Sequence, residues 1–188
     1  MSGRFCLAIS ALALLAAACA SSPPTRFYTL SDTAPGAPPA NGVGLVRIDG
    51  VTIPGELDRP ELVRRVGPNQ LSIAGLDRWA APLDQAILRV LTDDIALRVP
   101  APVPGEQHPV TVDIREFYGD ADCNVTLRAA WTPKVSRPET VQPMNEEIQV
   151  PSSGACPGTL AASMSTALGQ LSDRIIAGVL RLPPAAAR

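Results

Sequence analysis

The sequence contains very little histidine. His108 is the only one among 188 residues. It lies in a segment rich in Pro and Gly, residues 104–109, which is typical of an exposed loop and holds no nucleophile motif. A hydrolase triad needs a histidine base, and zinc needs three or four converging ligands. We therefore expect no catalytic residues and no metal site, and the isolated glycines predict no phosphate-binding loop.

An excess of positive charge is also missing. The 16 Lys and Arg residues face 18 Asp and Glu residues, for a net charge of −2. Nucleic-acid-binding proteins present a concentrated basic face, so this class is excluded. Beyond residue 18 no apolar run reaches membrane-spanning length, because Arg or Asp interrupts every candidate. The chain after that point is expected to touch a membrane only through an anchor.

The N-terminus has the composition of an export signal. Arg4 precedes an apolar run, residues 5–18, that is too short to span a bilayer and ends in small residues before Cys19. A cysteine at this position predicts a lipoprotein signal, residues 1–18, with a diacylglycerol and an acyl chain on Cys19 after cleavage. Each buried CH₂ contributes about 0.8 kcal/mol, so several acyl chains anchor a protein firmly. The alternative is an ordinary secretory signal, with Cys19 unmodified.

Two cysteines, Cys123 and Cys156, would remain in the body of the mature protein, whereas Cys6 would leave with the signal. In an oxidising periplasm such a pair predicts a disulfide. Closing a loop of about 33 residues would stabilise the fold by roughly 3 to 4 kcal/mol. Two free thiols are the alternative. No cofactor is expected besides the covalent lipid.

After a lipidated linker, residues 19–25, one folded domain is expected over residues 26–183, followed by a frayed tail, residues 184–188. Apolar alternation and turn signals predict strands at 26–30, 43–53, 61–66, 71–74, 110–118, 123–132 and 146–150. Apolar residues at helical spacing predict one helix that starts around residues 79–81 and stops before Pro100, and another at 159–182 capped by Thr159. The order β-β-β-β-α-β-β-β-α predicts an α+β fold: a largely antiparallel mixed sheet with two long helices on one face.

One short segment combines charge with rigidity. Leu57-Asp58-Arg59-Pro60 is typical of a turn, because Pro60 disfavours the helical conformation at Arg59. In a purely structural role, Asp58 would cap the turn and Arg59 would form a salt bridge. In a functional role, these four residues would form a docking or self-assembly surface, since turns on rigid scaffolds often carry recognition residues.

These motifs together resemble a known family. They are, in order, the lipobox cysteine Cys19, Phe27-Tyr28-Thr29-Leu30, Val51-Thr52-Ile53-Pro54, Leu57-Asp58-Arg59-Pro60, and Trp79-Ala80-Ala81-Pro82-Leu83 with the helix that follows. In this order and spacing they resemble the ABC-type transport auxiliary lipoproteins, the PqiC/YmbA-like family. In that family Trp79, Pro82 and Leu83 would belong to a motif of the core.

The resemblance implies a non-enzymatic lipoprotein of the outer membrane that faces the periplasm. Its partner would be an MCE-domain protein of an intermembrane lipid transport system, and a homo-oligomeric ring is plausible beside a six-fold MCE partner. Ala20, rather than Asp, after the lipidated cysteine also favours the outer membrane. The alternatives are a stand-alone lipid-binding lipoprotein with an apolar pocket and, less favoured, a periplasmic enzyme.

Overall fold

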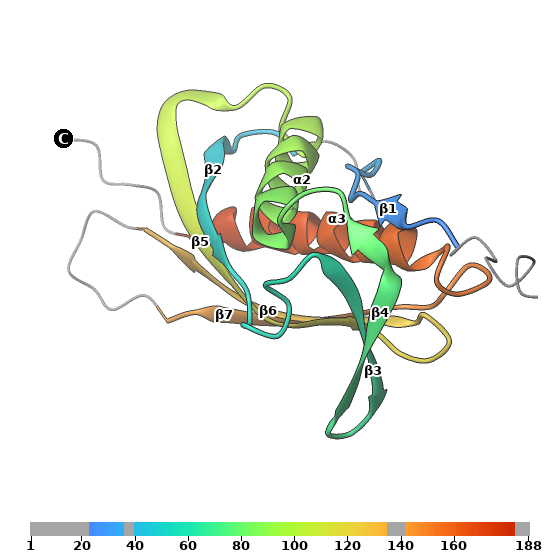
Figure 1. Ribbon diagram of the computed structural model, residues 1–188. Helices are drawn as coiled ribbons and strands as arrows, with labels where there is room; N and C mark the ends of the chain where they lie inside the picture. Colours follow the sequence, from blue (N-terminus) through green and yellow to red (C-terminus); the bar gives the residue numbers. More distant parts are fainter. Residues whose placement is uncertain (1–22, 36–39, 135–141, 183–188) are drawn as a thin grey trace, which may run out of the picture.

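The computed structural model describes residues 23–35, 40–134 and 142–182. Within them the chain forms the strands β1 (Arg26–Tyr28), β2 (Gly44–Thr52), β3 (Glu61–Gly67), β4 (Gln70–Trp79), β5 (Val103–Gly119), β6 (Val125–Pro133) and β7 (Met144–Val150), and the helices α2 (Leu83–Arg98) and α3 (Leu160–Val179) (Figure 1). The predicted order of elements and the single α+β domain are confirmed. The predicted signal peptide 1–18, Cys19 and the tail 184–188 lie outside the described residues.

All strands join one mixed sheet that does not close. Its order is β1-β4-β3-β5-β6-β7, with β2 paired to β5 off this path. The pairs β3–β4, β5–β6 and β6–β7 are antiparallel, as their short connections require. The pairs β1–β4 and β2–β5 are parallel and join segments that are far apart in the sequence.

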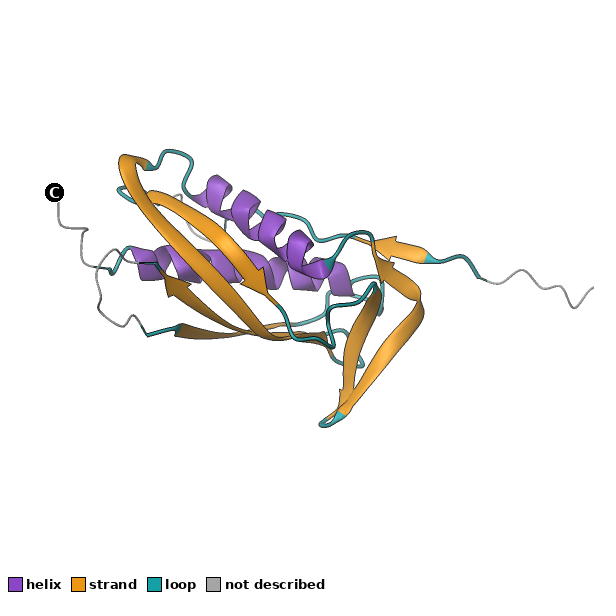
Figure 2. Ribbon diagram, turned by 60° about the vertical axis from the view of Figure 1, so that its left-hand side comes forward, coloured by secondary structure: helices purple, strands orange, loops and turns teal. Residues whose placement is uncertain are grey.

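The two helices lie on the same side of the sheet, which curls around them (Figures 1 and 2). Helix α3 packs across β5, β6 and β7, and α2 packs against α3 and β2. Large side chains that are less than 2 % exposed fill the layer between helices and sheet: Trp131, Phe117, Leu30, Leu62, Ile87, Leu91, Ile114, Leu127, Ile148, Leu160, Met164 and Leu168. This layer is the hydrophobic core of the domain.

A buried polar cluster fastens the segment after β1 to both helices. The Arg98 guanidinium donates to the carboxylates of Asp94 at 3.0 Å and Asp173 at 2.7 Å and to the Thr33 carbonyl at 3.2 Å. Asp94 also accepts the Thr33 N–H at 2.8 Å. Burial raises the pKa of the Asp94 carboxyl despite these bonds. Gly169 of α3 leaves room for the cluster, because a Cβ there would overlap the Thr33 hydroxyl.

Helix α2 begins later than the sequence predicts. Trp79 is the last residue of β4, and Pro82 is the N-cap residue before Leu83. The start expected at residues 79–81 is wrong because the Trp79 N–H is bonded to the Pro60 carbonyl and is held in the sheet. Trp79 and Leu83 belong to the core, as expected of the motif, while Pro82 is exposed.

Two further local expectations are also corrected. Thr159 is the N-cap of α3 by position, but no side-chain capping bond forms, since its hydroxyl is directed to the Gly154 carbonyl. His108 does not lie in a loop: β5 starts at Val103 and aligns His108 with Val46 of β2. The parallel partner β2 extends this strand over a stretch whose prolines suggested irregular chain.

Cys123 and Cys156 form a disulfide, with their Cα atoms 5.5 Å apart. The bond joins the β5–β6 turn to the segment that leads into α3. Cys123 has a φ of 62°, which is unusual for a residue other than glycine. The turn that holds it is fixed by Asp120, whose carboxylate accepts the N–H groups of Asp122 and Asn124, each at 2.9 Å.

Candidate functional site

The four-residue segment singled out in the sequence forms a tight turn before β3. The Leu57 N–H donates to the Pro54 carbonyl at 2.9 Å, and the Asp58 N–H donates to the Gly55 carbonyl at 3.3 Å. The Leu57 side chain is only 3 % exposed and lies in the core, so it cannot itself touch a partner. Asp58 and Pro60 are exposed, and Arg59 is half-buried.

Backbone hydrogen bonds bring three of the sequence motifs together at this turn. The Pro60 carbonyl accepts the Trp79 N–H at 2.7 Å, which joins the turn to the end of β4. One residue on, the Ala80 N–H donates to the Tyr28 carbonyl at 2.9 Å and joins the same place to β1. The segments around residues 28, 60 and 80 therefore lie side by side and are joined by backbone hydrogen bonds, although some twenty residues or more separate them in sequence.

A row of charges crosses the strands beside the turn. Arg59 donates to the Glu61 carboxylate at 3.1 Å, and the Arg78 guanidinium lies 3.7 Å from its other oxygen. Hydrogen bonding from Arg59 is the largest of the effects that hold the pKa of Glu61 below its usual value. Of the two interpretations of Arg59, the structure thus shows the salt bridge, and its partner is the first residue of β3.

A second ion pair closes the edge of the sheet. Arg26 of β1 donates twice to Asp77 of β4, at 2.6 and 3.0 Å, and the Tyr28 hydroxyl donates to the same carboxylate at 3.1 Å. Asp77 is 7 % exposed. Burial, and next the bond to Asp77, raises the pKa of the Tyr28 phenol. These contacts set β1, the first described strand, rigidly against β4.

The turn is also tied to the other half of the sheet. Glu56 accepts a hydrogen bond from the Tyr118 hydroxyl at 2.8 Å. The Arg65 guanidinium lies 4.8 Å from the centre of the Tyr118 ring, a cation–π contact. Burial and the bond to Glu56 raise the pKa of Tyr118 far above its ordinary value. The turn is therefore held from β3, β4 and β5 at once.

Within this rigid frame, the Asp58 carboxylate forms no hydrogen bond or ion pair with any residue of the described ranges. Exposed Pro60 lies two residues further along the chain. A fixed backbone that presents a free carboxylate beside a rigid ring suits recognition better than catalysis, because no other acid, base or nucleophile among the described residues is bonded to it.

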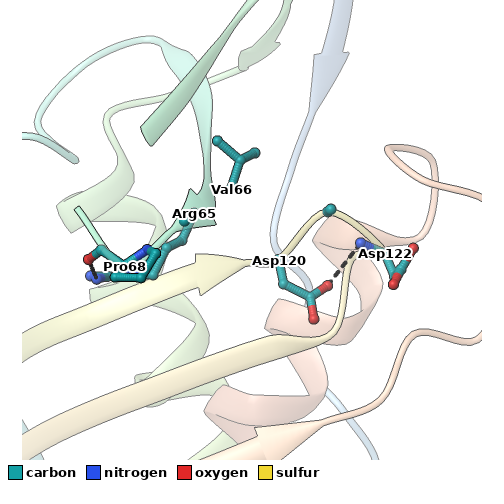
Figure 3. A pocket seen from close by; sticks show the side chains of 7 residues that line it. Arg65, Val66, Pro68, Asp120 and Asp122 are labelled. Carbon is teal, nitrogen blue, oxygen red and sulfur yellow. Dashed lines mark hydrogen bonds between the residues drawn. The ribbon is translucent and has the colours of Figure 1, made fainter. Parts of the chain in front are cut away.

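A shallow hollow of about 350 Å³ lies nearby, between the tip of the β3–β4 hairpin and the β5–β6 turn. Figure 3 shows Arg65, Val66 and Pro68 on one side and Asp120 and Asp122 on the other. Sequence reasoning missed it, because the two turns lie more than 50 residues apart. Arg65 is already engaged with Tyr118 and with the Pro68 carbonyl at 3.2 Å, so its charge is not free for a ligand in the hollow.

Residues 28–176 match the family model described as "ABC-type transport auxiliary lipoprotein component". The chain belongs to this family. The resemblance found in the sequence motifs is thereby confirmed over well more than half of the chain. By this description the family serves ABC-type transport in an auxiliary role and is not a known enzyme family.

Solved structures support the fold of this auxiliary lipoprotein. One is a protein described only as uncharacterized, with a TM-score of 0.68 and 19 % identity, covering 84 % of this chain and 99 % of its own. Another is a Xanthomonas campestris protein of the family DUF330, with a TM-score of 0.65 and 16 % identity, covering 82 % of this chain and 95 % of its own. No curated protein gives a significant match.

The auxiliary lipoprotein shows no group of three or more His, Cys, Asp or Glu side chains suited to a metal ion within residues 23–35, 40–134 and 142–182. Neither of the helices described there is long and apolar enough to cross a membrane.

Proposed function

We propose that the protein is a non-enzymatic lipoprotein component of an MCE/ABC-type intermembrane lipid transport system. Lipidated at Cys19, it is anchored in the outer membrane, faces the periplasm and docks the far end of an MCE-domain protein. The observation that carries the proposal is the convergence of three family motifs on one rigid turn with an unpaired, exposed Asp58.

The length of the linker supports docking at the membrane surface. The six residues between Cys19 and Arg26 reach at most about 20 Å. A partner must therefore come to the periplasmic surface of the membrane, as the end of a bridging tunnel would. Neighbouring genes for an MCE protein, a permease and an ATPase would support this proposal further.

The packing of the core favours docking over the alternative of a stand-alone lipid carrier. A carrier of this fold would hold lipid between sheet and helices. In the described part of the chain that layer is filled by side chains such as Trp131, Phe117 and Leu127, each at 0 % exposure.

The docking surface is tested by charge reversal. Asp58→Lys and Arg59→Glu should weaken capture of the co-expressed MCE protein. Each variant should unfold at nearly the wild-type temperature, because an exposed charge such as Asp58 and a surface ion pair such as Arg59–Glu61 contribute little to stability. Asp122→Lys is the matched control, since it makes the same charge change in another exposed turn. Unchanged capture by both docking variants would place the contact elsewhere. Unfolding of Arg59→Glu would assign Arg59 a purely structural role.

The anchor is tested separately. Cys19→Ala should abolish labelling by a palmitate analogue and release the protein from the membrane fraction. Full labelling of Cys19→Ala, or its retention in the outer membrane after a high-salt wash, would contradict lipidation at this residue.

A further inference from the structure

The outer face of the β1–β4 pair carries large apolar side chains that nothing in the described chain covers. Phe27 is 66 % exposed, the highest value among the large apolar residues described, and Leu76 is 37 % exposed. The register aligns Phe27 with Arg78, and Leu76 precedes Arg78 by two residues in the same strand. Because side chains alternate along a strand, all three share this face.

This face lies at one end of the sheet. β1 is the last strand on this side, and the β3–β4 hairpin extends from the same end, away from the helices (Figures 1 and 2). The hairpin adds two more exposed apolar side chains, Val66 at 41 % and Ile73 at 48 %. Neither is aligned with Phe27 or Leu76, so the shared apolar face consists of Phe27 and Leu76. Adjacent exposed apolar side chains mark an interaction site more often than isolated ones do.

One arginine, Arg78, shares this face with the apolar pair. Its side chain remains 43 % exposed although it lies 3.7 Å from the Glu61 carboxylate. Arg26 points to the opposite face, where it pairs with Asp77. Long arginine stems can lie along an apolar surface while their guanidinium groups stay among water and phosphate. Phe and Leu with basic neighbours are the composition of surfaces that lie in the plane of a lipid interface.

We propose that this face, Phe27 and Leu76, rests in the headgroup layer of the membrane that carries the anchor. The inference builds on the lipid at Cys19 and names the lipid surface as the partner. Cys19 and Phe27 are eight residues apart, so the Phe27 Cα can never be more than about 28 Å from the Cα of the anchored residue. Because the anchor tethers this face close to the bilayer, the effective concentration of lipid at Phe27 is high, and even a weak contact would form.

Quenching by brominated lipid tests the contact. The full-length, cell-processed protein with Phe27→Trp is reconstituted into vesicles of phosphatidylethanolamine and phosphatidylglycerol, brominated high on the acyl chains. The native Trp79 and Trp131 are 6 % and 0 % exposed, so the wild type supplies the baseline emission. The emission added by Phe27→Trp should shift to the blue and lose about half its intensity, because interfacial side chains reach the acyl boundary.

Leu180→Trp is the matched control. Leu180 is 51 % exposed at the C-cap of α3, and that end of the helix lies on the opposite side of the molecule from β1 (Figure 1). Its added emission should be quenched little. Equal quenching of both variants, or none for Phe27→Trp, overturns the proposal. A blue shift of Phe27→Trp that needs the MCE protein, or that follows protein concentration without vesicles, overturns it in favour of a protein contact.

Flotation of the same vesicles separates the two inferences. Protein that floats without quenching of Phe27→Trp leaves the anchor in place and overturns the membrane-contact face. If wild-type protein fails to float, the anchor is contradicted. Both Trp variants are then held on nickel-chelating lipid through a hexahistidine inserted after Ser22, and quenching confined to Phe27→Trp still supports the face.

Discussion

The two ends of the sheet are built differently. In the end formed by β5, β6 and β7, helix α3 covers one face, and the inward side chains of β6 are almost completely buried. At the other end, β4 alternates irregularly and leaves Ile73 and Leu76 exposed. β3 is aligned with β5 through one residue pair, Arg64 and Gly119.

The difference indicates that one end of the sheet stabilises the fold and the other end is available for recognition. The covered end holds helix α3 and the fully buried aromatic residues Phe117 and Trp131, whose apolar burial stabilises the fold. The disulfide lies where the two ends meet, because Arg64 of β3 is 3.3 Å from the Cys156 Sγ. The uncovered end holds the turn at residues 57–60, the ion pairs that Glu61 forms with Arg59 and Arg78, and the exposed Phe27. Substitutions at the covered end should therefore change the free energy of unfolding, and substitutions at the uncovered end should change binding.

The largest effect is expected from a pair of identical changes at the two ends. Leu127→Ala removes a side chain that is 0 % exposed and should lower the free energy of unfolding by about 3 to 5 kcal/mol. Leu76→Ala, at 37 % exposure, should cost about 0.5 kcal/mol. Urea denaturation of both variants measures the difference, and equal costs would remove the distinction between the two ends.

Loss of the disulfide should come next. The double variant Cys123→Ala, Cys156→Ala should lower the free energy of unfolding by roughly 3 to 4 kcal/mol, because the unfolded chain regains the entropy of an open loop. Capture of the MCE protein by the folded fraction should not change, since the bond joins the β5–β6 turn to the segment before α3 and not the turn at residues 57–60. Alkylation of the wild type without reductant checks the bond itself, and two modified thiols would disprove it.

A glycine pair should give a smaller difference. Gly169→Ala brings a Cβ onto the Thr33 hydroxyl beside Arg98, and this overpacking should cost about 1 to 3 kcal/mol, more than the gain in helix propensity. Gly75→Ala on β4 meets open space and should be neutral or slightly stabilising. Thermal unfolding compares the two variants. A stabilised Gly169→Ala would show that the cluster around Arg98 can rearrange.

The smallest effect is pH-dependent and concerns the hydrogen bond from the Tyr118 hydroxyl of β5 to the Glu56 carboxylate beside the turn. Its own backbone hydrogen bond, and next the Tyr118 hydroxyl, hold the pKa of Glu56 below its usual value. A lowered folded pKa stabilises the fold above the unfolded value of about 4.3, and this stabilisation is lost as the pH falls through the folded value. Since Glu56 is exposed, Glu56→Gln should cost less than about 1 kcal/mol at pH 7. The difference from wild type should shrink as the pH falls below the unfolded value, and one that grows on acidification would contradict the role of the carboxylate.

Much of the fold follows from local patterns. An apolar residue at every fourth position in α2 and alternating apolar residues in β6 predict the type of both elements and their bounds within a few residues. Each pattern indicates which side of the element is buried. The start of α2 is missed because nothing near Trp79 reveals its bond to Pro60, some twenty residues earlier. His108 is misplaced for the same reason, since the partner that extends β5 is β2.

The candidate site was only partly predictable. Composition marks residues 57–60 as a turn, and Pro60 and Asp58 are exposed as a docking surface would require. Nothing in the local pattern separates Leu57, which lies in the core, from its neighbours. The apolar face of Phe27 and Leu76 was not predicted, because a strand of three residues has too few alternations to show which side faces solvent.

The sequence by itself determined the order of the elements, the family and the disulfide partners. Periodicity and motif spacing are local features of the chain, and only Cys123 and Cys156 follow residue 19. Only the tertiary structure decided that β1 pairs with β4 and β2 with β5, both in parallel. Those pairings place three family motifs at one turn and leave one face of β1–β4 uncovered. The physical reason is that a strand's sequence specifies its buried side, whereas its partner is set by the packing of the whole sheet.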